Sequence, residues 1–290
     1  MRPRTSPGTR FKKRSADALI GCGQPSRRVR LRMNSGGSVR PGPRPPEGLL
    51  LLALSGLLFL VAALVAPPEI RGGAALALTA GLSIGGFLLP SILWARLRGF
   101  SSLAFPLRRP GPKEMAAALC FVAGGSLLAL SAAAWFSRLP GAGQEDEALR
   151  AFLSSFPIGV QWLAFALVPA VCEESLFRGA LLATLREFPA LPACLLSGAA
   201  FGLFHGSLYR FLPVAILGAS LAAVVLRTGN LALAVLGHAA HNGVVLAALH
   251  FGHENGHLME DAGWVWVGAA LGGTAILAAG LRLSGSRSPS

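Results

Sequence analysis

Residues 49–66 read LLLLALSGLLFLVAALVA, an apolar run of eighteen residues without a charged side chain. Such a run is typical of a helix that spans the hydrocarbon core of a bilayer, which takes about twenty residues. Similar runs, dominated by Ala, Leu and Gly, recur as far as Leu283. Only 13% of the chain is charged and 53% is hydrophobic, whereas soluble domains carry about 25% charged residues. The composition therefore predicts an integral membrane protein and excludes most soluble enzyme folds.

Each apolar run predicts one helix, because backbone groups in lipid must find their hydrogen-bond partners within the protein. We expect an all-α, polytopic integral membrane helix bundle with about eight transmembrane helices. The expected spans are 49–66, 73–95, 114–136, 151–171, 191–204, 208–226, 230–249 and 263–281. The stretch 151–188 can also form one long broken helix, or a span followed by a short interfacial helix, because Pro157 and Pro169 interrupt it.

The first 47 residues carry most of the positive charge. This tail has twelve Arg or Lys and only two acidic residues, Asp17 and Glu47, so it supplies +10 of the net charge of +13. It is rich in Pro, Gly and Ser, and we expect it to be disordered and attracted to anionic lipid, with no nucleic-acid partner. The basic loop that follows the second span predicts cytoplasmic N- and C-termini, in the inner membrane if the chain is bacterial.

Charged side chains are expensive inside a span, about 2.5–3.5 kcal/mol each, and so mark functional positions. The first such group is EESLFR at 173–178. Glu174 and Arg178 are one helical turn apart and can pair, which leaves Glu173 without a cation and able to face a cavity as a general base. A purely structural ion pair is the alternative.

Two further groups place imidazoles in apolar segments. His205 ends FGLFH at 201–205, and His238 lies one turn from Asn242 in HAAHN at 238–242. If they converge with Glu173 on one pocket, these side chains supply a base, an orienting or metal-binding group, and donors for a developing oxyanion. Structural hydrogen bonding between helices explains each of these polar residues separately about as well.

The three groups together resemble the CPBP family of intramembrane proteases. The resemblance rests on Glu-Glu-x-x-x-Arg at 173–178, Phe-x-x-x-His at 201–205 and His-x-x-x-Asn at 238–242, and it covers about residues 157–249. That family contains the type II CAAX prenyl endopeptidases and the abortive-infection-type membrane proteins. The resemblance implies that Glu173 activates the attacking water and that His205 assists it or binds metal.

The same resemblance implies that His238 and Asn242 bind metal or stabilise the oxyanion. Three residues would then be structural supports: Glu174, Arg178 and Phe201. The implied activity is that of an endopeptidase acting on a membrane-anchored peptide or protein. Its catalytic core would occupy 151–249, after N-terminal transmembrane helices at 48–150 and before a polar loop, a last helix and a short tail at 250–290.

Metal dependence is left open by the residues. A zinc ion held by His205, His238 and a carboxylate is one alternative, and a metal-free mechanism with Glu173 as base is the other. Two further functions stay open beside the protease: a catalytically silent binding or immunity membrane protein, and a small proton-coupled transporter.

A second motif, HENGH at 253–257, is a literal H-E-x-x-H sequence. A zinc site of that type needs a helix to bring its histidines together, whereas Asn255-Gly256 is a strong turn signal. We therefore expect a polar loop here, in which His250, His253 and His257 are suited to a weak surface metal site rather than to catalysis.

Overall fold

Helices make up nearly all of the protein in its computed structural model, which describes residues 42–67, 70–251 and 263–284. Seven helices of this described part are long and apolar enough to span a membrane. The prediction of an all-α polytopic membrane bundle is thereby confirmed. The basic tail up to residue 41 and the HENGH motif lie outside the described residues.

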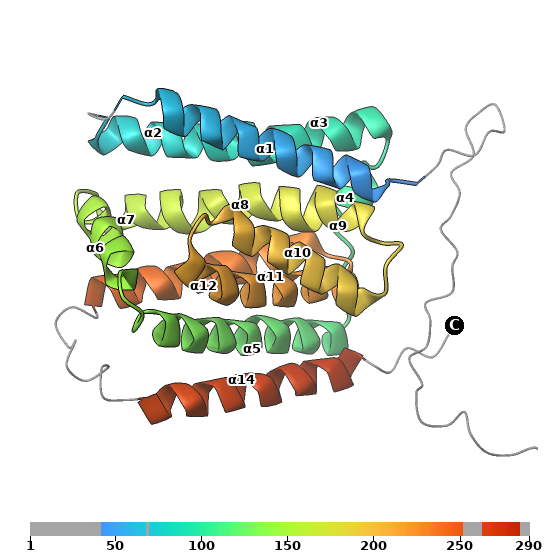
Figure 1. Cartoon of the computed structure of the whole chain (residues 1–290). Coiled ribbons are helices and arrows are strands. Elements are labelled where there is room, and N and C mark those ends of the chain that lie inside the picture. The colour runs from blue at the N-terminus through green and yellow to red at the C-terminus, as the bar shows by residue number, and fades with distance from the viewer. Residues whose placement is uncertain (1–41, 68–69, 252–262, 285–290) are drawn as a thin grey trace, which may run out of the picture. The chain divides into compact units, whose positions relative to one another are not determined.

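The chain order of the helices is drawn in Figure 1. The elements are α1 (Pro45–Val65), α2 (Gly72–Ser83), η1 (Ile84–Leu88), α3 (Leu89–Arg98), α4 (Ser101–Ala104), α5 (Pro112–Phe136), α6 (Ala142–Leu153), α7 (Ile158–Gln161), η2 (Trp162–Leu167), α8 (Val168–Glu174), η3 (Ser175–Leu181), α9 (Leu182–Thr184), α10 (Ala190–Phe204), α11 (Leu208–Thr228), α12 (Leu231–Phe251) and α14 (Gly263–Ser284). The η segments are π-helical turns, so α2 to α3 and α7 to α9 each form one continuous span.

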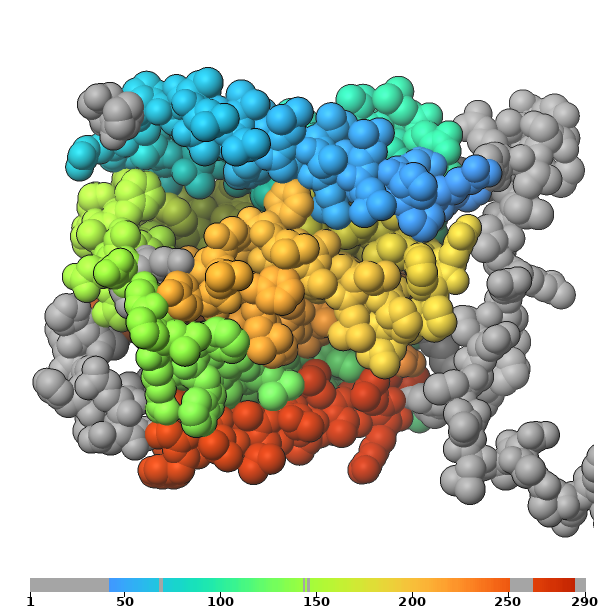
Figure 2. Space-filling view, in the orientation of Figure 1, coloured from blue at the N-terminus to red at the C-terminus, as the bar shows by residue number. Residues whose placement is uncertain are grey.

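The span from α7 to α9 lies at the centre of the packing. α12 packs on η2 and α8, α1 and α3 pack on η3, and α10 packs on η3 and α11. On the other side α5 packs on α11, and α14 packs on α5 as the outermost helix (Figure 1). In Figure 2, α10 lies between α1 in blue and α14 in red. The helices α10 and α12 therefore both pack against the central span, which carries EESLFR at 173–178.

Two expectations for the region before this span are wrong. The acidic residues Glu145, Asp146 and Glu147 predict a loop at 137–150, but the helix α6 occupies most of that segment. The span expected at 151–171 begins instead at Ile158 and runs to Thr184. Pro157 directly precedes the first turn of α7, where its missing N–H costs no helical hydrogen bond. The Gln161 side chain donates to the carbonyls of Leu153 and Phe156, which fixes the break between the two helices.

The expected span at 191–204 is an apolar helix of only 15 residues, shorter than a full bilayer crossing. Its residues Gly198 and Gly202 allow α10 to touch the backbone of α11. A Cβ added at Gly198 would lie 2.5 Å from the carbonyl oxygen of Ala215, and one at Gly202 would lie 2.6 Å from that of Phe211. Close helix approach through small residues is typical of membrane bundles.

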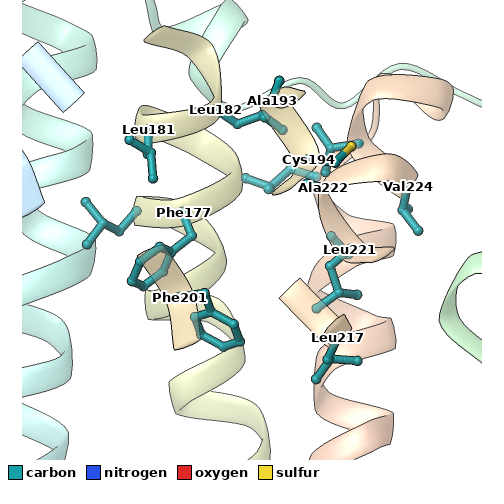
Figure 3. Close-up of a cluster of buried hydrophobic side chains, with 14 of the residues drawn as sticks. Phe177, Leu181, Leu182, Ala193, Cys194, Phe201, Leu217, Leu221, Ala222 and Val224 are labelled. Carbon is teal, nitrogen blue, oxygen red and sulfur yellow. The ribbon is translucent and has the colours of Figure 1, made fainter. Parts of the chain in front are cut away.

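An aromatic and aliphatic core lies between η3, α10 and α11. Figure 3 shows the ring of Phe177 facing that of Phe201, with Leu217 and Leu221 of α11 beside them. The two rings meet edge to face, with centroids 5.0 Å apart, and both side chains are fully buried. This core fixes the ends of the helices that carry the polar residues described next.

Candidate active site

Arg178, Glu174 and His238 form a buried ionic network. Arg178 Nη1 donates to Glu174 Oε1 at 2.7 Å, and neither side chain is exposed. The same carboxylate oxygen lies 2.9 Å from Nδ1 of His238 on α12. A carboxylate oxygen accepts hydrogen bonds, so Nδ1–H of His238 is the donor in this contact. The pair expected from the sequence is thus present, and His238 joins it as a third member.

Glu173 lies on the open side of this network. Its Oε2 is 3.9 Å from Nε2 of His238, and 17% of its side chain is exposed, whereas Glu174 is fully buried. The separation is longer than a hydrogen bond, so a single water molecule can contact both atoms. With Nδ1 engaged by Glu174, the other nitrogen of His238 faces the carboxylate that the sequence marks as the base.

The ring of Phe201 joins the two histidines. It lies edge to face with His205 at 4.9 Å and with His238 at 5.4 Å between centroids, and the Arg178 guanidinium lies 4.4 Å from its centre. His205 is exposed at the end of α10, and its Nδ1 lies 3.1 Å from the carbonyl oxygen of Phe201. Phe201 thus holds both imidazoles on one side of the ionic network, and Nε2 of His205 is not used in that contact.

Asn242 lies one turn beyond His238 on α12 and contacts a different part of the central span. Its Nδ2 donates to the carbonyl oxygen of Phe165 in η2 at 3.3 Å. Trp162 of η2 packs against Gly243, where an added Cβ would collide with the indole. Because α12 runs antiparallel to the central span, His238 meets α8 and Asn242 meets η2.

The spacing of the motifs did not predict two of these contacts. Both the Glu174 to His238 contact and the Asn242 to Phe165 contact join residues far apart in sequence, so they depend on how α12 packs. A local signal existed for the second one. Pro169 has no N–H, so the carbonyl four residues earlier, at Phe165, needs another donor.

An apolar groove lies beside the polar residues, between η2 and α12. It has a volume of about 390 Å³ and is lined by Trp162, Leu163, Ala166, Leu167, Ala239 and Ala240. The two alanines directly follow His238 in the sequence. An apolar chain seated there would lie next to the polar side chains of α12.

The described residues do not fit a zinc site. Nowhere among them do three or more His, Cys, Asp or Glu side chains gather closely enough to hold a metal ion. A catalytic zinc needs three protein ligands within about 2.0–2.3 Å of the metal. The mechanism that we propose for this protein therefore uses no metal ion.

The part of the chain that holds these residues matches a known family. Residues 155–244 match the family model described as Rce1-like, type II CAAX prenyl endopeptidase. The Rce1-like match covers about a third of the chain and contains all three motifs on which the resemblance to the CPBP family rests. No curated protein and no solved structure matches the chain.

The match confirms the resemblance drawn from the sequence. The segment is similar to that of an intramembrane endopeptidase of the Rce1-like family, and the described part of the chain has the apolar spans of an integral membrane protein.

Proposed function

We propose that this protein hydrolyses a peptide bond in a membrane-anchored peptide or protein, with Glu173 as the base that activates water. The observation that carries the proposal is the placement of Glu173 Oε2 at 3.9 Å from His238 Nε2, at the open edge of a buried ionic network. A carboxylate and an imidazole at this separation can hold one water between them.

The proposed reaction begins when the Glu173 carboxylate takes a proton from that water. The water oxygen bonds to the substrate carbonyl carbon, and the carbonyl electron pair moves onto its oxygen. Collapse of this intermediate restores the carbonyl and breaks the bond to nitrogen, while Glu173 returns the proton to the leaving amine. His205 assists by orienting the water through its free Nε2.

His238 and Asn242 are proposed to stabilise the oxyanion. His238 serves as a donor when both of its nitrogens carry protons, with Nδ1–H held by Glu174 and Nε2–H directed at the oxyanion. The Asn242 carboxamide has two N–H groups, so it can donate one to Phe165 and one to the oxyanion. Donors of this kind are usually the largest electrostatic contribution to acyl transfer.

The surroundings of these residues support a lipid-soluble substrate. The groove between η2 and α12 has an apolar lining, which includes Ala239 and Ala240 of the helix that carries His238. We propose that it accepts the membrane-embedded part of the substrate. A soluble peptide would gain little from such a surface.

We propose an orientation with both termini in the cytoplasm of a bacterial cell. Five cations support this, because they lie at the end of the second span, between the two spans and at the start of the third: Arg96, Arg98, Arg108, Arg109 and Lys113. Anionic lipid is the proposed partner of the basic tail.

The decisive experiment compares Glu173→Gln with Glu147→Gln, a control at an exposed position of α6. The probe is a farnesylated, internally quenched peptide in proteoliposomes, and membrane proteomes of cells making either variant extend the search to other substrates. We expect Glu173→Gln to abolish cleavage without loss of insertion or thermal stability, and the control to cut normally. Full activity in Glu173→Gln would remove the proposed base.

A further inference from the structure

The central span contains a proline inside the Rce1-like segment, next to the site. Pro169 is half-buried at the second position of α8, directly after the π-helical turns of η2. A proline at this position removes one hydrogen bond from the helix and crowds the carbonyl four residues earlier, which is that of Phe165. The wider turn of η2 accommodates that crowding, so the span continues through the proline.

The carbonyl of Phe165 accepts a hydrogen bond from another helix. Asn242 Nδ2 of α12 lies 3.3 Å from this oxygen, which has no α-helical donor at residue 169. This contact engages one N–H of the carboxamide. It also sets which way the amide plane faces, because a carboxamide held through one hydrogen has its second N–H and its carbonyl oxygen in fixed directions.

We propose that Pro169 is a positioning residue for the reaction, because it leaves the Phe165 carbonyl free to hold the Asn242 carboxamide in a productive orientation. The inference rests on the proposed function of Asn242 as an oxyanion donor and extends it to a residue that touches neither water nor substrate. An N–H at position 169 would compete with Asn242 for the Phe165 carbonyl. The carboxamide would then be held less firmly and its orientation would be less fixed.

The experiment uses Pro169→Ala, Asn242→Ala and the double variant in the full-length protein. Thermal unfolding in detergent tests the contact without reference to activity. Asn242→Ala should lower Tm by a few degrees in the wild-type background, because a buried carbonyl loses its donor. The same substitution should change Tm little in the Pro169→Ala background, where position 169 supplies a main-chain N–H. Additive shifts in Tm would overturn the inference, since they would mean that the two residues do not share one carbonyl.

Turnover of the farnesylated quenched peptide tests the functional part. Pro169→Ala should reduce kcat about tenfold to a hundredfold with KM nearly unchanged, which is the effect of a misplaced catalytic group. Its Tm should stay equal or rise, because alanine suits a helix interior better than proline. The double variant should be no slower than Asn242→Ala alone. Pro213→Ala, which removes the proline inside α11, is the matched control and should keep its kcat.

The outcomes separate this inference from the proposed function. Slow turnover in Asn242→Ala together with normal turnover in Pro169→Ala would overturn the positioning role alone. Normal turnover in Asn242→Ala would overturn the proposed role of Asn242, and the positioning role with it. A loss of kcat in Pro213→Ala as large as that in Pro169→Ala would also overturn the inference, because any helix proline would then have the same effect.

Discussion

Replacing Glu174 by glutamine tests whether the buried network orients His238 or only holds the helices together. Glutamine has nearly the same size but no charge, so Arg178 would lose its ion-pair partner while both positions remain fully buried. Removing one partner of a buried pair costs about 3–5 kcal/mol. At roughly 2–4 °C per kcal/mol for a chain of this size class, Tm should fall by roughly 10 °C.

The effect on turnover has a separate cause. Glu174 Oε1 lies 2.9 Å from His238 Nδ1, and this charged partner holds the imidazole in the orientation that the proposed mechanism needs. Loss of that charge should lower kcat by roughly 10²–10⁴, as expected for a catalytic imidazole without its carboxylate partner. Initial rates on the farnesylated quenched peptide, measured well below the Tm of the variant, provide this value.

A second substitution separates the two effects. Adding Arg178→Met to Glu174→Gln removes the unpaired cation, so most of the lost stability should return. Turnover should stay low, because His238 still faces an uncharged partner. The stability of the double variant is measured as its Tm by tryptophan fluorescence. If this Tm and the cleavage rate both recovered, Glu174 would serve only as a counter-ion for Arg178, and the proposed role of Glu174 in orienting His238 would be wrong.

Four further outcomes are expected. Replacing His205 or His238 by alanine should each slow the cleavage of the quenched peptide by at least about a hundredfold, and near-normal rates would remove them from the site. Turnover should persist after dialysis against a zinc chelator, and a loss restored by added zinc would reopen the metal alternative. Glu254→Ala, in the HENGH motif, should cleave normally, and an inactive variant would move the site to that segment. Gly202→Val should lower Tm by several degrees, since its Cβ would meet the carbonyl of Phe211 at 2.6 Å, and an unchanged Tm would contradict the close helix contact.

Local patterns in the sequence were sufficient to predict the membrane spans and the ion pair within the central span. The runs of apolar residues gave most of the helix bounds to within a few residues, because a bilayer demands both length and hydropathy. The Glu174 to Arg178 pair also follows from spacing alone, since residues four apart share a helix face.

The contacts between helices could not be predicted from the sequence alone. His238 lies 64 residues from Glu174, and which face of α12 meets α8 is set by the antiparallel packing of the two helices. The helix α6 was missed for a different reason. Its acidic residues indicated a loop, while Leu149 and Leu153 on the same segment pack with Leu246 of α12 and with Ala166.

The backbone contact between α10 and α11 has a consequence for altering this protein. At Gly198 and Gly202 the two helices meet without intervening side chains, so any larger residue there would push His205 away from its neighbours. These two glycines therefore cannot be replaced without moving the helices. Ala239 and Ala240, which are not fully buried, line the apolar groove instead. Efforts to change the shape of the groove should therefore begin with these two alanines.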